Sequence, residues 1–154
     1  MANFDIALKK GELGEDIIRK YLEEKGWIVY FPFTKNKAHA FDMLCTYKKE
    51  KVIAIDVKTK ARLNKYAAQG IDIRSYNEYL YFKKTMNISF LLIFVDDKNG
   101  DVHAFEIGKE MENFQIGKII FWYLKDMMFL FNIGKEKIKE LSKYDQRNYN
   151  YEPI

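Results

Sequence analysis

The sequence predicts an α/β domain, and two kinds of pattern indicate it. Apolar residues recur at helical spacing from Leu8 to Lys25, and a second helix is expected from Tyr76 to Met86, where Ser75 and Glu78 form a capping box. Short apolar segments bounded by turn residues read as strands, most clearly Val52–Lys58. With 154 residues, 48% of them apolar, the chain is expected to form a single domain with a core at about 8–107 and an aromatic-rich C-terminal extension at about 108–154.

The composition of the chain limits which partners, metal sites and cellular compartments are expected. The formal charge of +4 permits a polyanionic partner without requiring one. A single cysteine, Cys45, excludes an internal disulfide and a Cys-rich zinc site, which fits a reducing compartment. The N-terminus lacks the pattern of a signal peptide, and the apolar runs are far shorter than the roughly 20 residues of a membrane helix. We therefore expect a cytoplasmic protein that does not enter a membrane.

The first helix carries one acid in an unusual place. Glu15 lies on the same stripe as Ile18 and Leu22, whereas Glu12 and Asp16 fall on the side expected to face solvent. A carboxylate that borders a buried face is costly unless it is paired or binds a metal ion. Glu15 is thus the candidate functional acid of this helix. An acid that only stabilises the helix dipole is the alternative.

A strand, a polar loop and a hairpin are expected next. The strand 27–31 ends before Pro32, and the basic segment Thr34–Lys37 reads as a loop. Phe41–Tyr47 should pair with the Val52 strand as a hairpin. Asp42, near the start of Phe41–Tyr47, is a second carboxylate at the margin of an apolar surface, and a turn or strand-start cap is its other interpretation.

The strand Val52–Lys58 places an acid beside an amine. Alternation along a strand puts Ala54, Asp56 and Lys58 on one face and Ile55 and Val57 on the other. Asp56 and Lys58 therefore lie side by side on a face that would otherwise bury apolar residues. A surface ion pair, worth at most about 1 kcal/mol, is the alternative.

The segment after this strand is basic. Lys60, Arg62 and Lys65 stand close to Tyr66, and Gln69 follows them. Basic residues with an aromatic neighbour, directly downstream of acids, suit contact with a phosphate backbone. A solvated loop explains the same composition equally well.

The second half of the chain adds strands and one more helix. Strands are expected at 90–95, as a central strand, and at 102–107, followed in 118–133 by two strands or a strand and a short helix. A short helix is expected at 135–143, and the tail 145–154 is expected to be frayed or docked on a partner. Tyr76, Tyr79 and His103 are interpreted as structural residues.

Glu15, Asp42 and Asp56 indicate a function when they are considered as one group. Carboxylates that a helix and two strands bring to one place would repel one another, and hard oxygen ligands of this kind suit Mg²⁺ or Mn²⁺. The residues Gly14–Asp16, Phe41–Met43 and Ile55–Lys58, in this order, resemble the PD-(D/E)xK nuclease superfamily, most closely the archaeal-type Holliday junction resolvases and related phage nucleases. Two departures are Phe41 in place of proline and Asp56 in place of the usual glutamate.

The resemblance implies a restriction-endonuclease-like fold, a mixed central sheet flanked by helices, and a Mg²⁺-dependent endonuclease acting on DNA, with branched or junction DNA as a candidate substrate. Glu15, Asp42, Asp56 and the Val57 carbonyl would hold the metal, and Lys58 would orient the nucleophilic water. Contacts to nucleic acid would come from Lys60, Arg62, Lys65 and Gln69. A homodimer is implied because a junction presents two symmetric strands. The alternatives are a non-cleaving nucleic-acid or protein-binding module of the same fold, and an RNA-directed or restriction-type nuclease.

Overall fold

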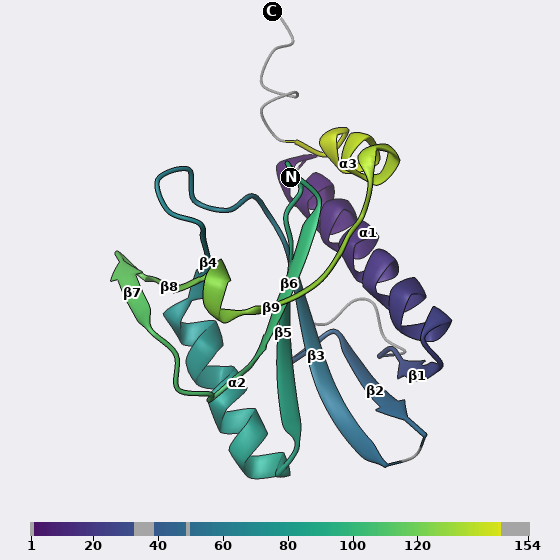
Figure 1. Ribbon diagram of the computed structural model, residues 1–154, viewed down its shortest axis with the longest axis vertical. Coiled ribbons are helices and arrows are strands. Elements are labelled where there is room, and N and C mark those ends of the chain that lie inside the picture. Colours follow the sequence, from purple (N-terminus) through teal and green to yellow (C-terminus); the bar gives the residue numbers. More distant parts are fainter. Residues whose placement is uncertain (1, 33–38, 49, 146–154) are drawn as a thin grey trace, which may run out of the picture.

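The computed structural model describes residues 2–32, 39–48 and 50–145, and within them the chain forms two sheets and three α-helices (Figure 1). The main sheet has six strands in the order β1-β2-β3-β5-β6-β9, and the small sheet has three in the order β4-β8-β7. The strand β3 pairs antiparallel with β2 and parallel with β5, so the main sheet is mixed. The expected loop Thr34–Lys37 and the tail beyond residue 145 lie outside the described residues.

The main sheet consists of β1 (Trp27–Tyr30), β2 (Met43–Tyr47), β3 (Lys51–Thr59), β5 (Ser89–Val95), β6 (Asp101–Glu106) and β9 (Met128–Asn132). The small sheet consists of β4 (Ala68–Asp72), β7 (Asn113–Ile116) and β8 (Ile119–Tyr123). The helices are α1 (Ala2–Glu24), α2 (Ile73–Met86), α3 (Lys135–Ser142) and the short 3₁₀ turn η1 (Leu124–Asp126).

Both long helices begin earlier than the sequence patterns predict. The helix α1 extends six residues further toward the N-terminus and stops before Gly26, whose φ of +90° suits glycine. The start predicted for α2 is wrong: its N-cap is Asp72, whose side chain accepts the backbone N–H of Arg74, and Ser75 lies inside the helix. Since β4 ends at Asp72, the helix follows the strand without a loop.

Several strands differ from the predictions. The strand β2 begins at Met43, so Asp42 stands just before it. The segment 118–133 contains two strands, β8 and β9, joined by η1. Neither β4 nor β7 was predicted, because the sequence of β4, Ala-Gln-Gly-Ile-Asp, has few residues that favour strands. Pairing with β8 gives β4 its strand geometry.

The two faces of the main sheet bury separate apolar clusters. One cluster joins α1 to the sheet and includes Ile18, Ile55 and Val57. The other lies on the α2 side and includes Ala54 and Trp122. The strand β3 thus sends alternate residues to opposite faces, as its sequence predicts, and its C-terminal end lies beside α1 and continues into the loop to β4 (Figure 1). Among the described helices, none combines the length and apolar character needed to cross a membrane.

A close approach between α1 and β3 fixes the position of the first helix. Gly14 is buried against Thr59, and a Cβ atom added at Gly14 would lie 1.8 Å from Thr59 Oγ1 and 3.0 Å from Thr59 Cβ. Only glycine permits this contact, and Glu15 is the next residue of the helix. The approach therefore determines where the carboxylate of Glu15 lies relative to β3.

We expect Gly14→Ala to destabilise the protein by about 1–3 kcal/mol, because the added methyl group forces α1 away from Thr59. Thermal unfolding should show a melting temperature lower by roughly 2–4 °C for each kcal/mol. Gly11→Ala is the matched control in the same helix, since a Cβ there has nothing within 4 Å. That substitution should raise stability by roughly 0.5–1 kcal/mol, and equal effects of the two changes would contradict the close approach.

Candidate active site

The three predicted acids come from three different elements and meet beside β3. Glu15 lies on α1, Asp42 precedes β2, and Asp56 lies within β3. The backbone N–H of Asp42 donates to the Ile55 carbonyl at 3.0 Å, and Asp42 Oδ2 accepts the backbone N–H of Val57 at 2.6 Å. These two hydrogen bonds fasten the start of β2 to β3. They fix Asp42 between the other two acids.

The acids form a chain of contacts. Asp42 shares side-chain hydrogen bonds with Glu15 and with Asp56. Burial, followed by the charges of Asp56 and Glu15, raises the pKa of Asp42 to about 9. Burial also raises the pKa of Glu15, and the charge of Asp56 adds to this effect. The site therefore concentrates more negative charge than its own residues neutralise.

Asp56 has two close partners on the α2 side of the sheet. The Asp56 side chain is buried, and its Oδ2 atom accepts a hydrogen bond from the Tyr79 hydroxyl at 2.5 Å. Lys58 Nζ lies 3.0 Å from the same oxygen, so the acid and the amine lie side by side as the strand alternation predicts. The Lys58 ammonium also lies 6.0 Å from the centre of the Tyr79 ring.

Tyr79 is the site residue that sequence reasoning missed. Its helical spacing indicates a core position, and it is indeed buried, with its ring stacked on Phe90 at 4.7 Å. A buried tyrosine hydroxyl usually finds a hydrogen-bond partner. This rule predicts that the Tyr79 hydroxyl has a hydrogen-bond partner, although it does not identify Asp56 as that partner. Burial and the nearby charge of Asp56 raise the pKa of Tyr79, which keeps the hydroxyl as a donor.

The donor set fits a divalent cation of the magnesium type. Carboxylate and carbonyl oxygens are its preferred ligands, and a cation would relieve the repulsion that raises the pKa of Asp42. On β3, the pairing with β2 ends at Ile55. The backbone of Val57 therefore lies beyond the residues that pair with β2, and its N–H faces Asp42. Among the described residues, no group of three or more Asp, Glu, His or Cys side chains is placed so that it could hold a metal ion as it stands. The acids contact one another in pairs, and Tyr79 and Lys58 occupy one oxygen of Asp56.

The basic residues predicted to contact nucleic acid separate into two groups. Lys60 is partly buried, and burial together with the charge of Lys58 lowers its pKa to about 8. Lys65 is exposed in the loop beyond it. Arg62 instead donates to Asp96 Oδ2 at 2.8 Å and to Asp101 Oδ2 at 3.1 Å. These contacts tie the loop to the turn after β5.

Gln69 is also directed inward. It is buried, and its Nε2 atom donates to the Lys60 carbonyl at 2.9 Å. Gln69 and Arg62 therefore hold the loop 60–67 in shape, while the side chains of Lys58, Lys60 and Lys65 supply the positive charge along it.

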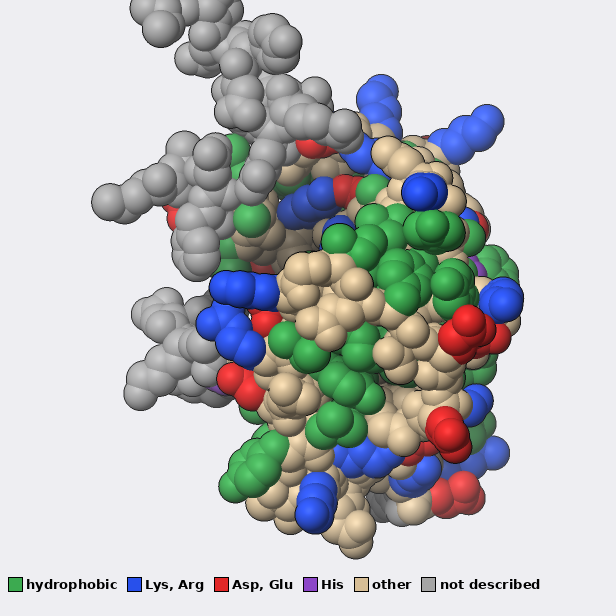
Figure 2. All heavy atoms as spheres, turned by 90° about the vertical axis from the view of Figure 1, so that its left-hand side faces the viewer, with side chains coloured by type: hydrophobic (Ala, Val, Ile, Leu, Met, Phe, Trp, Pro, Cys, Tyr) green, Lys and Arg blue, Asp and Glu red, His purple; other side chains and the backbone are tan. Residues whose placement is uncertain are grey.

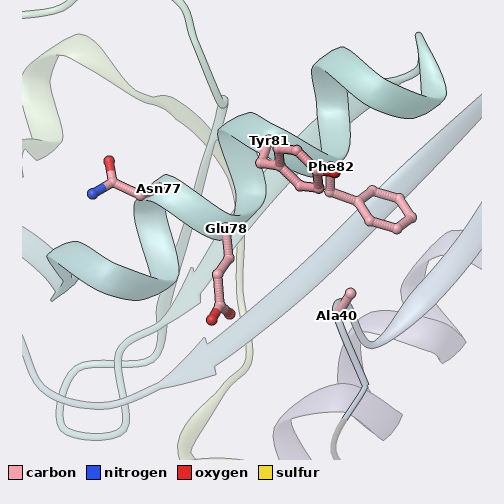
Figure 3. Close-up of a pocket in the computed structure, with 5 residues that line it drawn as sticks. All are labelled: Ala40, Asn77, Glu78, Tyr81 and Phe82. Atoms are coloured by element: carbon pink, nitrogen blue, oxygen red, sulfur yellow. The ribbon is translucent and has the colours of Figure 1, made fainter.

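A shallow hollow of about 490 Å³ lies between the segment before Asp42 and the outer side of α2 (Figure 3). Ala40 faces Phe82 across it, and Asn77, Glu78 and Tyr81 also line it. Among its lining residues that the structure describes, the charged one is the acid Glu78, so they offer no cation to a phosphate group.

Comparison with solved structures identifies the fold. The structure of Hjc from Archaeoglobus fulgidus, described as a Holliday junction resolvase from an archaeal hyperthermophile, superposes with a TM-score of 0.59. The match covers 79% of this chain and 92% of that chain at 11% sequence identity. No protein-family model and no curated protein sequence matches the chain. The expected restriction-endonuclease-like fold, with a mixed central sheet flanked by helices, is confirmed.

Removal of one acid should stabilise the metal-free protein. We expect Asp42→Asn to raise the melting temperature in EDTA at pH 8, because the amide keeps the acceptor for Val57 N–H and removes a carboxyl group that must take up a proton to be buried beside the other acids. The folded-state pKa of Asp42 lies above its ordinary value, so the wild type should lose stability as pH rises from about 5 towards 9. Melting curves at pH 5, 7 and 9 should show a shallower loss for Asp42→Asn, and parallel curves would contradict the charge cluster.

Proposed function

We propose that this protein is a Mg²⁺- or Mn²⁺-dependent endonuclease that hydrolyses DNA phosphodiester bonds. The observation that carries the proposal is the meeting of Glu15, Asp42 and Asp56 beside Lys58, with the pKa of Asp42 raised to about 9. Such a cluster costs stability in a protein that has no use for it, and active sites are where perturbed carboxyl groups gather. The nuclease fold of the solved neighbour supports the same reaction class.

Each residue has a defined task in this reaction. Glu15, Asp42, Asp56 and the Val57 carbonyl would hold the cation, which when bound supplies a polarised phosphate and a water of lowered pKa. Lys58, 3.0 Å from Asp56, would orient the attacking water and offset charge on the phosphate. Tyr79 acts through Asp56 and is therefore a positioning residue. Lys60 and Lys65 would contact the backbone of the DNA.

Branched DNA is the substrate class we favour. The superposed Hjc is a Holliday junction resolvase, and the resemblance of the three acidic segments leads to the same class. A four-way junction presents two equivalent strands, so we also propose that the protein acts as a homodimer. A cytoplasmic location remains a prediction.

A non-cleaving binding module is the second candidate. The observation that favours it is that Tyr79 and Lys58 both engage the same oxygen of Asp56, the residue that replaces the usual glutamate. If this oxygen stays engaged, Asp56 has only its Oδ1 atom left for a cation, which weakens the metal site. The same fold and the same basic loop would then bind nucleic acid or a protein without cutting.

Cleavage of a DNA panel separates the two candidates. Wild type is incubated with labelled linear duplex, single strand, flap and four-way junction in Mg²⁺, Mn²⁺ or EDTA. We expect metal-dependent cutting that falls at least about a hundredfold in Asp56→Asn and Lys58→Ala. Wild type that binds these substrates and never cuts them would reject the nuclease and leave the binding module.

The first helix offers a matched pair for the same assay. Glu15→Gln should lose cutting, because it removes a carboxylate from the cluster. Glu12→Gln changes an exposed acid three residues away on the same helix and should cut at the wild-type rate. Similar losses in both variants would indicate a general effect of helix charge and would contradict the assigned role of Glu15.

A further inference from the structure

The small sheet presents an aromatic surface to the outside. Along β8, Ile120 and Trp122 are buried in the α2-side cluster, so the alternate residues Phe121 and Tyr123 lie on the opposite face. This sheet stands apart from α1 in Figure 1, and Figure 2 shows hydrophobic side chains gathered on that side of the molecule, with Lys and Arg side chains around them.

The aromatic rings on this face contact one another. Phe114 of β7 stacks on Phe121 with centroids 5.3 Å apart and an interplanar angle of 14°, and lies 5.2 Å from Tyr123. Tyr66, in the loop before β4, approaches Phe114 edge-on at 5.6 Å. We call these four residues, Tyr66, Phe114, Phe121 and Tyr123, the aromatic platform. Tyr66 is 42% exposed and the other three are half-buried.

The partner strand β4 has a glycine, and so no side chain, beneath the Phe121 ring. Gly70 pairs with Phe121, and a Cβ atom added at Gly70 would come within 2.6 Å of the Phe121 ring. The ring therefore lies over the backbone of β4, where any side chain would displace it. The result is a face of rings with no bulky aliphatic side chain above β4.

Two exposed lysines accompany the rings. Lys65 Nζ lies 5.4 Å from the centre of the Tyr66 ring, and Lys125 Nζ lies 5.4 Å from that of Tyr123. Neither lysine has a salt-bridge partner within the described part of the chain. Tyr66 and Tyr123 are thus each paired with an ammonium group that is available to an anion.

The platform is physically joined to the candidate active site. The loop 60–67 leads directly from the end of β3 to β4, and Tyr66 stands in it. Gln69 of β4 donates to the Lys60 carbonyl at 2.9 Å, and the Leu63 N–H donates to the Ala68 carbonyl at 3.1 Å. The loop that leads from Lys58 and Lys60 therefore also carries Lys65 and Tyr66, and its hydrogen bonds to β4 tie the two regions together.

We propose that the aromatic platform, with Lys65 and Lys125, binds unpaired nucleotides of the DNA substrate next to the cleavage site. This inference rests on the proposed function for its choice of substrate. Rings that accept stacked bases, together with cations that contact phosphates, are the two components of single-strand binding surfaces. A nucleic-acid strand supplies bases for the rings and phosphates for the two ammonium groups at the same time, and the chain carries a net charge of +4, so nucleic acid is the occupant that the charges favour.

Binding measured without cleavage tests the platform. Fluorescence anisotropy in EDTA would compare a labelled 12-nucleotide dT strand with a blunt duplex. Tyr66→Leu/Tyr123→Leu removes ring faces and keeps apolar volume, so we expect dT binding to weaken at least about fivefold for each ring used, with an unchanged dependence on salt. Lys65→Ala/Lys125→Ala keeps the rings and should lower the slope of log K against log salt by about 0.7 per lysine.

Matched controls lie elsewhere on the surface. Phe129→Leu changes a 55%-exposed aromatic on β9, and Lys139→Ala changes an exposed lysine on α3; both should bind dT as wild type does. Unaltered dT binding in both platform variants would overturn the proposal, as would unaltered binding with a change in molar mass measured by light scattering, which would assign the surface to contacts between copies. Platform-dependent binding by a wild type that never cuts would support the platform and reject the nuclease.

Discussion

Mutual repulsion among Glu15, Asp42 and Asp56 is the constraint on which the arrangement of this protein depends. Three acids at the edge of a core would separate if the chain were free to move, so each is held by a different contact. Gly14 lets α1 approach β3, the Val57 N–H fixes Asp42, and the Tyr79 hydroxyl fixes Asp56. The two apolar clusters of the sheet provide the rigid frame that these contacts require.

The two faces of the sheet contribute different things to the site. The face covered by α1 brings the carboxylate of Glu15, which forms no salt bridge within the described ranges, whereas the face covered by α2 brings the Tyr79 hydroxyl and carries Lys58 next to Asp56. A single strand, β3, links the faces because its alternate residues point in opposite directions. Asp42 completes the connection, since it accepts from Val57 and shares hydrogen bonds with both other acids.

The sequence predicts those parts of the site that local geometry determines. Strand alternation is sufficient to place Asp56 beside Lys58, and the helical stripe is sufficient to place Glu15 at the margin of a buried face. Contacts between distant residues are a different matter. Tyr79 lies 23 residues from Asp56, and Arg62 lies 34 residues from Asp96, so the hydroxyl partner and the inward-directed guanidinium become visible only in the folded chain. The N-cap of α2 was mistaken for a related reason: β4, which ends at Asp72, forms through pairing with β8, about 50 residues later.

The residues after 107 bear on the site through a chain of packing contacts. Trp122 of β8 packs on Phe105 at 4.7 Å and on Tyr76 at 5.1 Å, which attaches the small sheet to both the main sheet and α2. Tyr79, one turn along α2 from Tyr76, donates to Asp56. A displacement of β8 would therefore reach the carboxylate through α2. The small sheet therefore has an inner face that stabilises the position of α2 and an outer face of aromatic rings, so the nucleotide binding proposed for the outer face can be tested by substitutions that leave this inner packing unchanged.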